Sequence, residues 1–274
     1  MLKPTLFTLG LLSVTLTACT TTSLQADPDS QPTISVGNLE HGKQLHGTWG
    51  YANHQVPPEK WGDAEVNRLC KAGQAQSPID VHTVTRVAAG SPNQVTLSTH
   101  YQADDFDIKN NGHTIVFNTK NPNLNTLELN GTTYKLLQFH YHIPSEHTVM
   151  NTYYPLEIHF VHANDAGNLA VIGVLVKNGN KNNDLDGIIN NLPISDTSHT
   201  LASLNVAHLM PKDSATYTYN GSLTTPPCSE QVHWLLKATP IQASAEQLSV
   251  LSKLYDGNNR PIQPQGNRTV YMVE

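Results

Sequence analysis

From about residue 90 to the C-terminus, the sequence is a succession of short segments with the composition of β-strands. Turn signals separate these segments at 110–112 (NNG), 130–131 (NG), 165–168 (DAGN) and 220–221 (NG). Because antiparallel neighbours need only a short connection, the pattern predicts a mostly antiparallel sheet. The expected strands are QVTLSTHY, TIVFNT, TLELNGTTYKLLQFHYH, PLEIHFVHA, LAVIGVLVKN, ATYTYNGSL and VHWLLKA.

Helical patterns are scarce in the same region. The segment SAEQLSVLSKLYD begins with Ser244, a residue suited to cap a helix, and its leucines at 248, 251 and 254 recur at helical spacing. A helix is therefore predicted there, and the segment SDTSHTLASLNVAHLM, 195–210, is expected to be partly helical near its middle. No internal repeat or second domain boundary is visible, so we predict one mainly β domain with a few short helices.

The segment QFHYHIPSEH, 138–147, sets three histidines and a glutamate within ten residues. Successive side chains of a strand point to opposite faces, so His140 and His142 share a face. In PLEIHFVHA the same alternation puts Glu157 and His159 on one face. A neighbouring antiparallel strand could bring His159 opposite the first pair. Three converging imidazoles form a ligand set that leaves a fourth position of Zn²⁺ open for water.

Two further side chains stand where they could orient these imidazoles. A metal-ligating imidazole needs an acceptor for its second nitrogen. Gln138 precedes His140 by two residues, and Glu157 precedes His159 by two residues. Lining a strand face with such groups gives up burial worth roughly 1.5 to 3 kcal/mol per large apolar residue. The pattern therefore favours a metal site, and histidines satisfied within a core are the alternative.

The first 19 residues have the pattern of a targeting segment. Lys3 precedes an apolar run from Leu6 to Leu16, and small residues follow. This run is too short for a membrane-spanning helix of about 20 residues, so we expect export without a transmembrane anchor. LTAC at 16–19 resembles a bacterial lipobox, which predicts cleavage before Cys19 and lipidation of this cysteine. An ordinary signal peptide is the alternative.

Residues 20–45 are polar, contain prolines and lack periodicity. Such a tract is expected to be a flexible tether between a membrane and a folded domain. The domain itself is predicted over residues 46–274. A leader followed by a tether of this kind predicts a periplasmic or cell-envelope protein that contacts the membrane only through its lipid.

The chain has three cysteines. Lipidation of Cys19 would leave Cys70 and Cys228 as a pair, and disulfides persist in the oxidising compartments that exported proteins enter. We therefore predict a disulfide between Cys70 and Cys228, with two buried thiols as the alternative. Zinc ligation is disfavoured, because these cysteines are far apart in sequence and neither has a CxxC partner.

The charge pattern argues against a nucleic-acid-binding protein. Charged residues make up 14% of the chain, below the typical ~25%, and the formal net charge is −6. A protein that holds phosphates needs a clustered excess of Lys and Arg, and the sequence has no such cluster. Asn, Thr, Ser and Gln are plentiful instead, which describes a surface solvated mainly by neutral polar groups.

Six stretches carry a resemblance to a known family. They are QSPID at 76–80, NNGH at 110–113, QFHYHIPSEHTV at 138–149, LEIHFVH at 156–162, GSLTTPPC at 221–228 and NNRPIQP at 258–264. In residues, order and spacing they resemble the alpha-class carbonic anhydrases, over roughly residue 46 to the C-terminus. The short IPSEH connection and the positions of the two cysteines are similar to the bacterial, secreted branch. The resemblance implies a large, twisted, mainly antiparallel sheet with short peripheral helices and a zinc ion at the bottom of a conical cleft.

The resemblance also implies the reaction, which is reversible hydration of CO2 to bicarbonate and a proton by attack of a zinc-bound hydroxide. It carries the zinc ligands over to His140, His142 and His159. In this family a matching threonine and glutamate orient the hydroxide. Thr224 would accept the proton of the hydroxide while donating its own to Glu146. A turn threonine and a surface carboxylate are the alternative interpretations.

Further roles follow from the same resemblance. His113 matches the histidine that exports protons to buffer, although a turn histidine is often only solvent-exposed. Thr225 would face the bicarbonate, and a homodimer is expected from bacterial relatives. The carbon dioxide pocket would be lined by Val161, Val171, Leu223, Val232 and Trp234, which sequence alone would place in an ordinary core.

Two other classes of protein compete with this interpretation. One is a zinc hydrolase of esters that uses the same hydroxide, and comparing esterase with hydration rates would separate the two. The other is a non-catalytic relative retained as a binding module. Such relatives typically lack a zinc ligand, whereas all three histidines are present here. His147 is expected to be structural rather than a ligand.

Overall fold

The computed structural model describes residues 49–52, 55–88, 90–193, 198–213 and 215–274. Contacts within the chain divide it into two units, Met1–Gly42 and Lys43–Glu274, and the described residues all belong to the second. The expected leader and tether, residues 1–45 with Cys19, lie outside the described residues. In the part of the chain that the structure describes, no helix is both long enough and apolar enough to cross a membrane.

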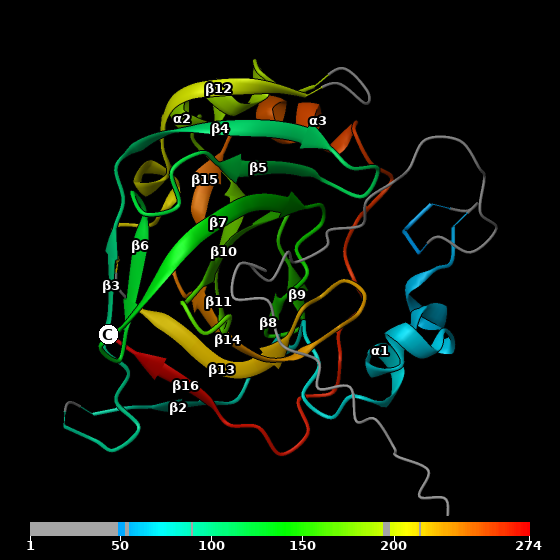
Figure 1. Cartoon of the computed structure of the whole chain (residues 1–274), viewed down its shortest axis with the longest axis vertical. Helices are drawn as coiled ribbons and strands as arrows, with labels where there is room; N and C mark the ends of the chain where they lie inside the picture. The colour runs from blue at the N-terminus through cyan, green and yellow to red at the C-terminus, as the bar shows by residue number, and fades with distance from the viewer. Residues whose placement is uncertain (1–48, 53–54, 89, 194–197, 214) are drawn as a thin grey trace, which may run out of the picture. The chain divides into compact units, whose positions relative to one another are not determined.

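A large mixed sheet forms the centre of the second unit (Figure 1). In spatial order, its strands are β12 (Ser198–Asn205), β4 (Ala103–Asn110), β5 (Ile115–Thr119), β7 (Thr132–His142), β10 (Leu156–Ala163), β11 (Leu169–Asn178), β14 (Glu230–Lys237), β13 (Thr216–Ser222), β16 (Val270–Val273) and β2 (Val84–Arg86). Beside this row, β15 (Ile241–Ala243) pairs with β11, and β6 (Thr126–Leu129) pairs with both β7 and β3 (Leu97–His100). A separate small sheet contains β1 (Asp80–Val81), β8 (Thr148–Val149) and β9 (Thr152–Tyr153).

Most neighbouring strands of the large sheet are antiparallel, as the turn signals predict. The exceptions in the described sheet are β11 with β14, β11 with β15, and β16 with β2, which pair in parallel. Three of the four predicted turns are confirmed. Gly112, Gly131 and Gly167 have φ angles of +83°, +75° and +80°, a region that glycine enters without steric cost.

The turn predicted at 220–221 is wrong, because both residues lie inside β13. A side chain at Gly221 would collide with Ser77 Oγ and with the rings of Trp234 and Tyr219. The glycine at this position therefore allows close packing of a strand rather than a change of chain direction.

Short helices accompany the sheet. They are the 3-10 helices η1 (Pro58–Asp63), η2 (Glu65–Asn67) and η3 (Val206–Leu209) and the α-helices α1 (Leu69–Ala72), α2 (Asn183–Ile189) and α3 (Ala245–Ser252). The predicted helix after Ser244 is confirmed as α3, which begins with a capping box between Ser244 and Gln247. The helix predicted near the middle of 195–210 is wrong, because residues 198–205 form β12 against β4 and η3 follows only at Val206.

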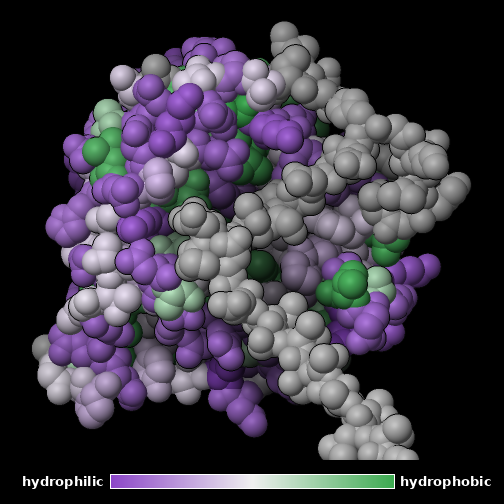
Figure 2. Space-filling view, in the orientation of Figure 1, coloured by the Kyte–Doolittle hydropathy of each residue, from purple (hydrophilic) through white to green (hydrophobic). Residues whose placement is uncertain are grey.

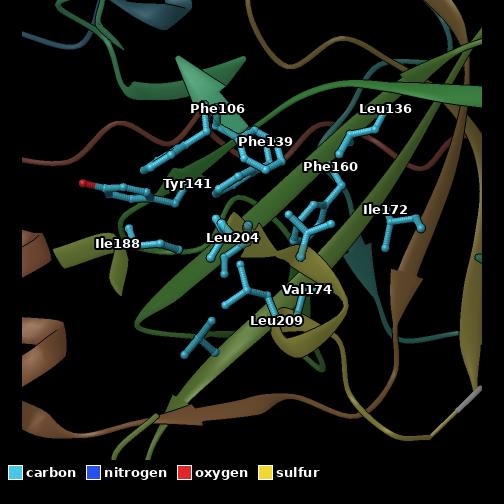
Figure 3. Packing of buried hydrophobic residues seen from close by; sticks show 14 of the residues in the cluster. Phe106, Leu136, Phe139, Tyr141, Phe160, Ile172, Val174, Ile188, Leu204 and Leu209 are labelled. Carbon is cyan, nitrogen blue, oxygen red and sulfur yellow. The ribbon is translucent and has the colours of Figure 1, made fainter. Parts of the chain in front are cut away.

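Apolar side chains pack on both faces of the sheet. Because strand side chains alternate, Ile158 and Phe160 of β10 lie in the larger core while Val161 lies in the smaller one. Figure 3 shows the larger core, where aromatic rings gather between the strands, and the rings of Phe117 and Phe139 stack with centroids 4.3 Å apart. The opposite face is left for the smaller core and for His140, His142 and His159.

The exposed surface is mainly polar, as the composition predicts. On the face drawn in Figure 2, most described residues are hydrophilic. The large apolar side chains exposed among the described residues are Val66, Met150, Tyr153 and Val250. They are divided among η2, the turn between β8 and β9, β9 itself and α3, so they do not form one common patch.

The predicted disulfide between Cys70 and Cys228 is present. The two Cα atoms are 5.0 Å apart and the residues are separated by 158 positions in sequence. The bond joins α1 to the loop that follows β13. It is packed in a small apolar cluster with Trp61, so it ties the start of the described chain to a loop from its last quarter.

Candidate metal centre

Strands β7 and β10 bring together the three histidines that the sequence singled out. The antiparallel register sets His159 opposite His140 and Glu157 opposite His142. The ring centroids lie 5.0 Å apart for His140 and His142, 5.3 Å for His140 and His159, and 4.6 Å for His142 and His159. One nitrogen from each ring lies within 4.8 Å of the other two. The alternation of side chains along two paired strands therefore produces a cluster of three imidazoles.

The second nitrogens of two of these rings are held by the side chains that sequence spacing indicated. His140 Nδ1 donates to Gln138 Oε1 at 2.8 Å, and His159 Nε2 donates to Glu157 Oε1 at 2.8 Å. Each bond fixes the tautomer of its ring. His140 thus directs Nε2, and His159 directs Nδ1, toward the shared centre.

The third ring has a partner that sequence reasoning did not find. His142 Nδ1 donates to the main-chain oxygen of Asn258 at 2.6 Å. Every residue carries such an oxygen, so no side-chain pattern could have indicated it, and the family match of 258–264 was the available signal. His142 Nε2 is left facing the other two histidines.

The donor set fits a zinc ion. His142 is 2% exposed at its side chain, yet its Nε2 has no hydrogen-bond partner among the described residues. A buried nitrogen without a partner is costly, and coordination to a cation would satisfy it. Three imidazoles whose second nitrogens are bound by acceptors are the arrangement that Zn²⁺ favours in catalytic sites.

The protonation states of the rings suit metal binding. Burial lowers the pKa of His142 to about 4, and it also lowers the pKa of His140 and His159 below the ordinary value. The neutral imidazole is the form that binds a metal. Near neutral pH the site therefore needs to release no protons before it accepts a cation.

Glu157 connects the site to a buried network. Its carboxylate accepts from His159 at 2.8 Å and from His147 Nδ1 at 2.7 Å, and the main-chain amides of Glu146 and His147 donate to its other oxygen at 2.9 and 2.8 Å. Burial raises the pKa of Glu157, but the interactions with His147 and His159 outweigh it and hold this pKa well below its usual range. His147 Nε2 in turn accepts from the Tyr219 hydroxyl at 2.7 Å.

Glu146 lies against the histidine cluster and is fully buried. Its Oε2 is 3.5 Å from His142 Nε2 and 3.8 Å from His159 Nδ1, while its Oε1 accepts from the Arg260 amide at 2.8 Å. Burial raises the pKa of Glu146 to about 7, although His159, the Arg260 amide and the Thr224 hydroxyl each act to lower it. Thr224, 5% exposed, is therefore close to this carboxylate, as the resemblance implied.

The apolar residues expected around the substrate gather beside the histidines. Val161, Val171, Val232 and Trp234 are buried in the smaller core, with Leu223 packed against it. The ring of Trp234 lies with its centroid 4.9 Å from that of His159. Thr225 is half-buried in the loop after β13.

His113 lies in the turn between β4 and β5. Its ring stacks on Trp49 with centroids 3.9 Å apart and planes 13° from parallel, and this stack, rather than a contact with the three histidines, is its ring contact in the described structure. His113 is half-buried, and burial lowers its pKa.

Arg260 is a second residue that sequence reasoning did not single out. Its guanidinium, 1% exposed, donates to Gln76 Oε1 at 2.9 Å, to the Ser77 carbonyl at 2.7 Å and to the Cys70 carbonyl at 2.8 Å. Its amide holds Glu146. Arg260 thus links the disulfide region to the carboxylate beside the histidines.

Comparison with known proteins decides the family. The sequence model of the eukaryotic-type carbonic anhydrases matches residues 56–274. The chain belongs to the alpha carbonic anhydrase family. As a carbonic anhydrase it is an enzyme whose family reaction is CO2 hydration and whose family metal is zinc, and the three-histidine cluster is the group on this chain that could bind that ion.

The similarity extends over most of this carbonic anhydrase. A carbonic anhydrase from Neisseria gonorrhoeae is 37% identical over 233 residues, which cover 84% of this chain and 89% of the relative. The alpha-carbonic anhydrase of Thermovibrio ammonificans, solved with the inhibitor sulfanilamide, superposes with a TM-score of 0.76 at 37% identity, covering 81% of this chain and 98% of that one. The Photobacterium profundum enzyme gives a TM-score of 0.73 at 38% identity, covering 81% and 99%.

Proposed function

We propose that this carbonic anhydrase hydrates CO2 at a Zn²⁺ ion held by His140, His142 and His159. The observation that carries the proposal is the set of three imidazole nitrogens within 4.8 Å of one another, each on a ring whose other nitrogen is bound by an acceptor. Bound Zn²⁺ supplies hydroxide near neutral pH by lowering the pKa of water to about 7, an effect for which carbonic anhydrases are themselves the reference case. The protein's residues hold the metal, orient the reacting groups and carry the released proton away.

Thr224 and Glu146 orient the attacking hydroxide. The Thr224 hydroxyl donates to Glu146, so its oxygen would be free to accept a hydrogen from the nucleophile that bound Zn²⁺ supplies. Thr224 would thereby orient this nucleophile toward the carbon of CO2. The support is that Thr224 and Glu146 are buried and close together, and that Glu146 is held from its other side by Arg260.

An uncharged substrate needs an apolar pocket. The smaller core supplies such a pocket beside His159. Polar side chains buried there would lose their hydrogen bonds to water, and CO2 offers too few hydrogen bonds to compensate. Thr225 faces the bicarbonate product from the loop after β13. The residues assigned to the pocket are Val161, Val171, Leu223, Val232 and Trp234.

His113 carries the proton from the site to buffer. An imidazole that titrates near neutral pH suits this task, and His113 is half-buried in the turn that joins β4 to β5. Its stack on Trp49 holds the ring in one orientation. Gln138 and Glu157 stay with the metal ligands and take no part in this transfer.

Measuring CO2 hydration and ester hydrolysis on the same preparation tests the proposal against the esterase alternative. We expect hydration to exceed ester hydrolysis by orders of magnitude in kcat/KM, because the pocket is built for a small apolar molecule. We also expect sulfanilamide, which is bound to the Thermovibrio ammonificans relative, to suppress both activities. An efficient esterase with negligible hydration would refute the proposed reaction.

Replacing Thr224 by valine should lower kcat/KM for hydration by about 10²-fold, the usual effect of removing one polar group that orients the reaction. The valine keeps the shape of threonine but can neither accept from the hydroxide nor donate to Glu146. Stopped-flow hydration at saturating buffer measures the loss. Thr218→Val, at a buried threonine within β13, is the control and should keep its rate; an unchanged rate in Thr224→Val would exclude the orienting role.

Replacing His113 by alanine should slow CO2 turnover much more in weak buffer than in concentrated imidazole, since free imidazole can replace the missing ring. His113 accepts a proton only when neutral, and burial lowers its pKa. The wild-type kcat in weak buffer should therefore rise with pH and level off with a midpoint below about 6.5, the value for a free histidine. An equal loss in both buffers would rule out the proton-export role.

The proposal includes export. The leader would be cleaved before Cys19, and this cysteine would be lipidated. A tether over residues 20–45 would then connect the membrane to the domain over 46–274, in the periplasm or cell envelope. We expect the enzyme to be a homodimer there. The disulfide between Cys70 and Cys228 supports export, because such bonds persist in oxidising compartments. Mass spectrometry of the mature N-terminus should find a lipid-modified Cys19, and an unmodified N-terminus at another residue would instead indicate an ordinary signal peptide.

A further inference from the structure

Strands β5 and β7 separate before they reach His113. Their antiparallel register runs from Asn118 opposite Gln138 to Val116 opposite His140, where it ends. Continuing it would place His113 opposite Ile143. In the structure the gap between these two residues is bridged by a side chain from another part of the chain, that of Asn258.

The side-chain amide of Asn258 makes hydrogen bonds where the two strands no longer bond to each other. Its Oδ1 accepts from the Ile143 amide at 2.7 Å, and its Nδ2 donates to the His113 carbonyl and to the Tyr141 carbonyl, both at 3.1 Å. Asn258 is fully buried. Both hydrogens of its amide group are used, one on the turn that carries His113 and the other on β7.

The main chain of the same residue holds a metal ligand. The Asn258 carbonyl accepts from His142 Nδ1 at 2.6 Å, and its amide donates to the Ile143 carbonyl at 3.1 Å. We propose that Asn258 is a positioning residue for proton transfer. Its side chain fixes the position of the His113 turn relative to the end of β7, where His142 lies. This inference rests on the proposed function, in which His113 exports the proton.

Hydrogen bonds within the turn hold its residues together, so its attachments to the rest of the chain decide where His113 lies. Asn111 Oδ1 accepts from the amides of His113 and of the following residue, both at 2.9 Å, which stiffens the turn internally. Two further attachments hold the ends of the turn, because the Tyr255 hydroxyl donates to Asn110 Oδ1 at 2.9 Å and the Thr114 hydroxyl donates to the Tyr141 carbonyl at 2.7 Å. Loss of the Asn258 amide should therefore tilt the whole turn rather than unfold it.

Asn258→Ala is the variant that tests the inference, since it removes the side-chain amide and leaves the carbonyl that holds His142. We expect full zinc content, kcat/KM within about twofold of wild type, and kcat in weak buffer lower on the order of tenfold, because a misplaced group slows a transfer that depends on geometry. Concentrated imidazole should restore kcat. Asn125→Ala is the matched control: Asn125 is also a fully buried asparagine, and its amide bonds to Gln102 and Asp104 instead of the turn.

A second readout does not depend on activity. In the zinc-loaded enzyme, the ring protons of His113 followed by NMR should titrate at a higher pH in Asn258→Ala than in wild type, because a displaced ring is less buried. Asn125→Ala should leave this titration unchanged. In the double variant Asn258→Ala/His113→Ala, the weak-buffer loss should equal that of His113→Ala alone, since both changes act on one step.

The outcomes separate the inference from the function on which it rests. If His113→Ala shows the buffer-dependent loss but Asn258→Ala lowers kcat and kcat/KM together without rescue by imidazole, Asn258 acts on the metal site and the inference is overturned while proton export by His113 stands. If His113→Ala shows no such loss, both fall. If Asn258→Ala does not fold, Asn258→Asp takes its place, because aspartate keeps the acceptor for Ile143 and removes both amide donors. A wild-type proton-transfer rate in Asn258→Asp would equally overturn the inference.

Discussion

Replacing His159 with alanine should abolish zinc binding and reduce CO2 hydration by roughly 10³-fold or more, out of the 10⁶-fold or greater acceleration typical of enzymes. The ring lies in the register position opposite His140 and is oriented by its bond to Glu157, so the variant loses one of the three imidazole ligands. Removing zinc from the wild type with a chelator should cause the same loss, and adding zinc back should reverse it.

Zinc content and thermal unfolding give the measurement two further readouts. The wild type should gain stability with added zinc, because an ion that binds only the folded state stabilises that state. His159→Ala should show neither bound zinc nor this gain. Gln138→Ala provides a graded control, since removing the acceptor of a ligand ring typically weakens metal binding by about 10- to 100-fold. Hydration that persists in His159→Ala with one zinc per chain would refute the ligand assignment.

Replacing Cys70 and Cys228 together by alanine should lower the free energy of unfolding by about 5 kcal/mol, because the disulfide closes a loop of 158 residues and so restricts the unfolded chain. Urea unfolding of the variant and of the wild type, with and without reductant, measures the change. Reduced wild type should match the variant in reductant, where the variant itself should not change. A difference below about 1 kcal/mol would mean that the unfolded chain gains little freedom when the bond is lost.

The same variant should also lose activity before it unfolds. Cys228 closes the turn that begins at Thr225, since the Cys228 amide donates to the Thr225 carbonyl at 2.9 Å. The Gln76 side chain donates to the Cys228 carbonyl at 3.1 Å. Releasing Cys228 frees the loop that carries Thr224. Hydration measured below the unfolding midpoint should therefore fall in kcat/KM, whereas an unchanged rate would show that the loop is held without the bond.

The sequence predicts the features of this site that depend on neighbouring residues in one strand. Alternation along β7 and β10 brings His140, His142 and His159 to one face, and a separation of two residues places Gln138 beside His140. These relations survive folding because the period of a strand is two. β10 is the next long strand after β7, although β8 and β9 lie between them in sequence. An antiparallel pairing of the two could therefore be expected to bring His159 to the other two histidines.

Relations between distant segments could not be predicted in this way. Asn258 and Arg260 act through main-chain atoms or across more than 100 residues, and nothing in their own neighbourhood indicates the partner. β4 was missed for a related reason, because Asp104 and Asp105 are typical of a turn. Asp104 is nevertheless buried, where Asn121 Nδ2 donates to it at 2.6 Å, so partners from elsewhere in the chain satisfy a charge that local rules would place in solvent.

The buried Arg260 has a consequence for biosynthesis. The carbonyl groups of Cys70 and Ser77 lack their donor until its guanidinium is made, and Cys70 leaves the ribosome 190 residues earlier. At ~5–20 residues per second, that interval is roughly 10 to 40 s. Until Arg260 emerges, Glu146 lacks its amide partner and His142 lacks the carbonyl of Asn258. The nascent chain therefore holds its three histidines without a finished site until the last part of the sequence has been made.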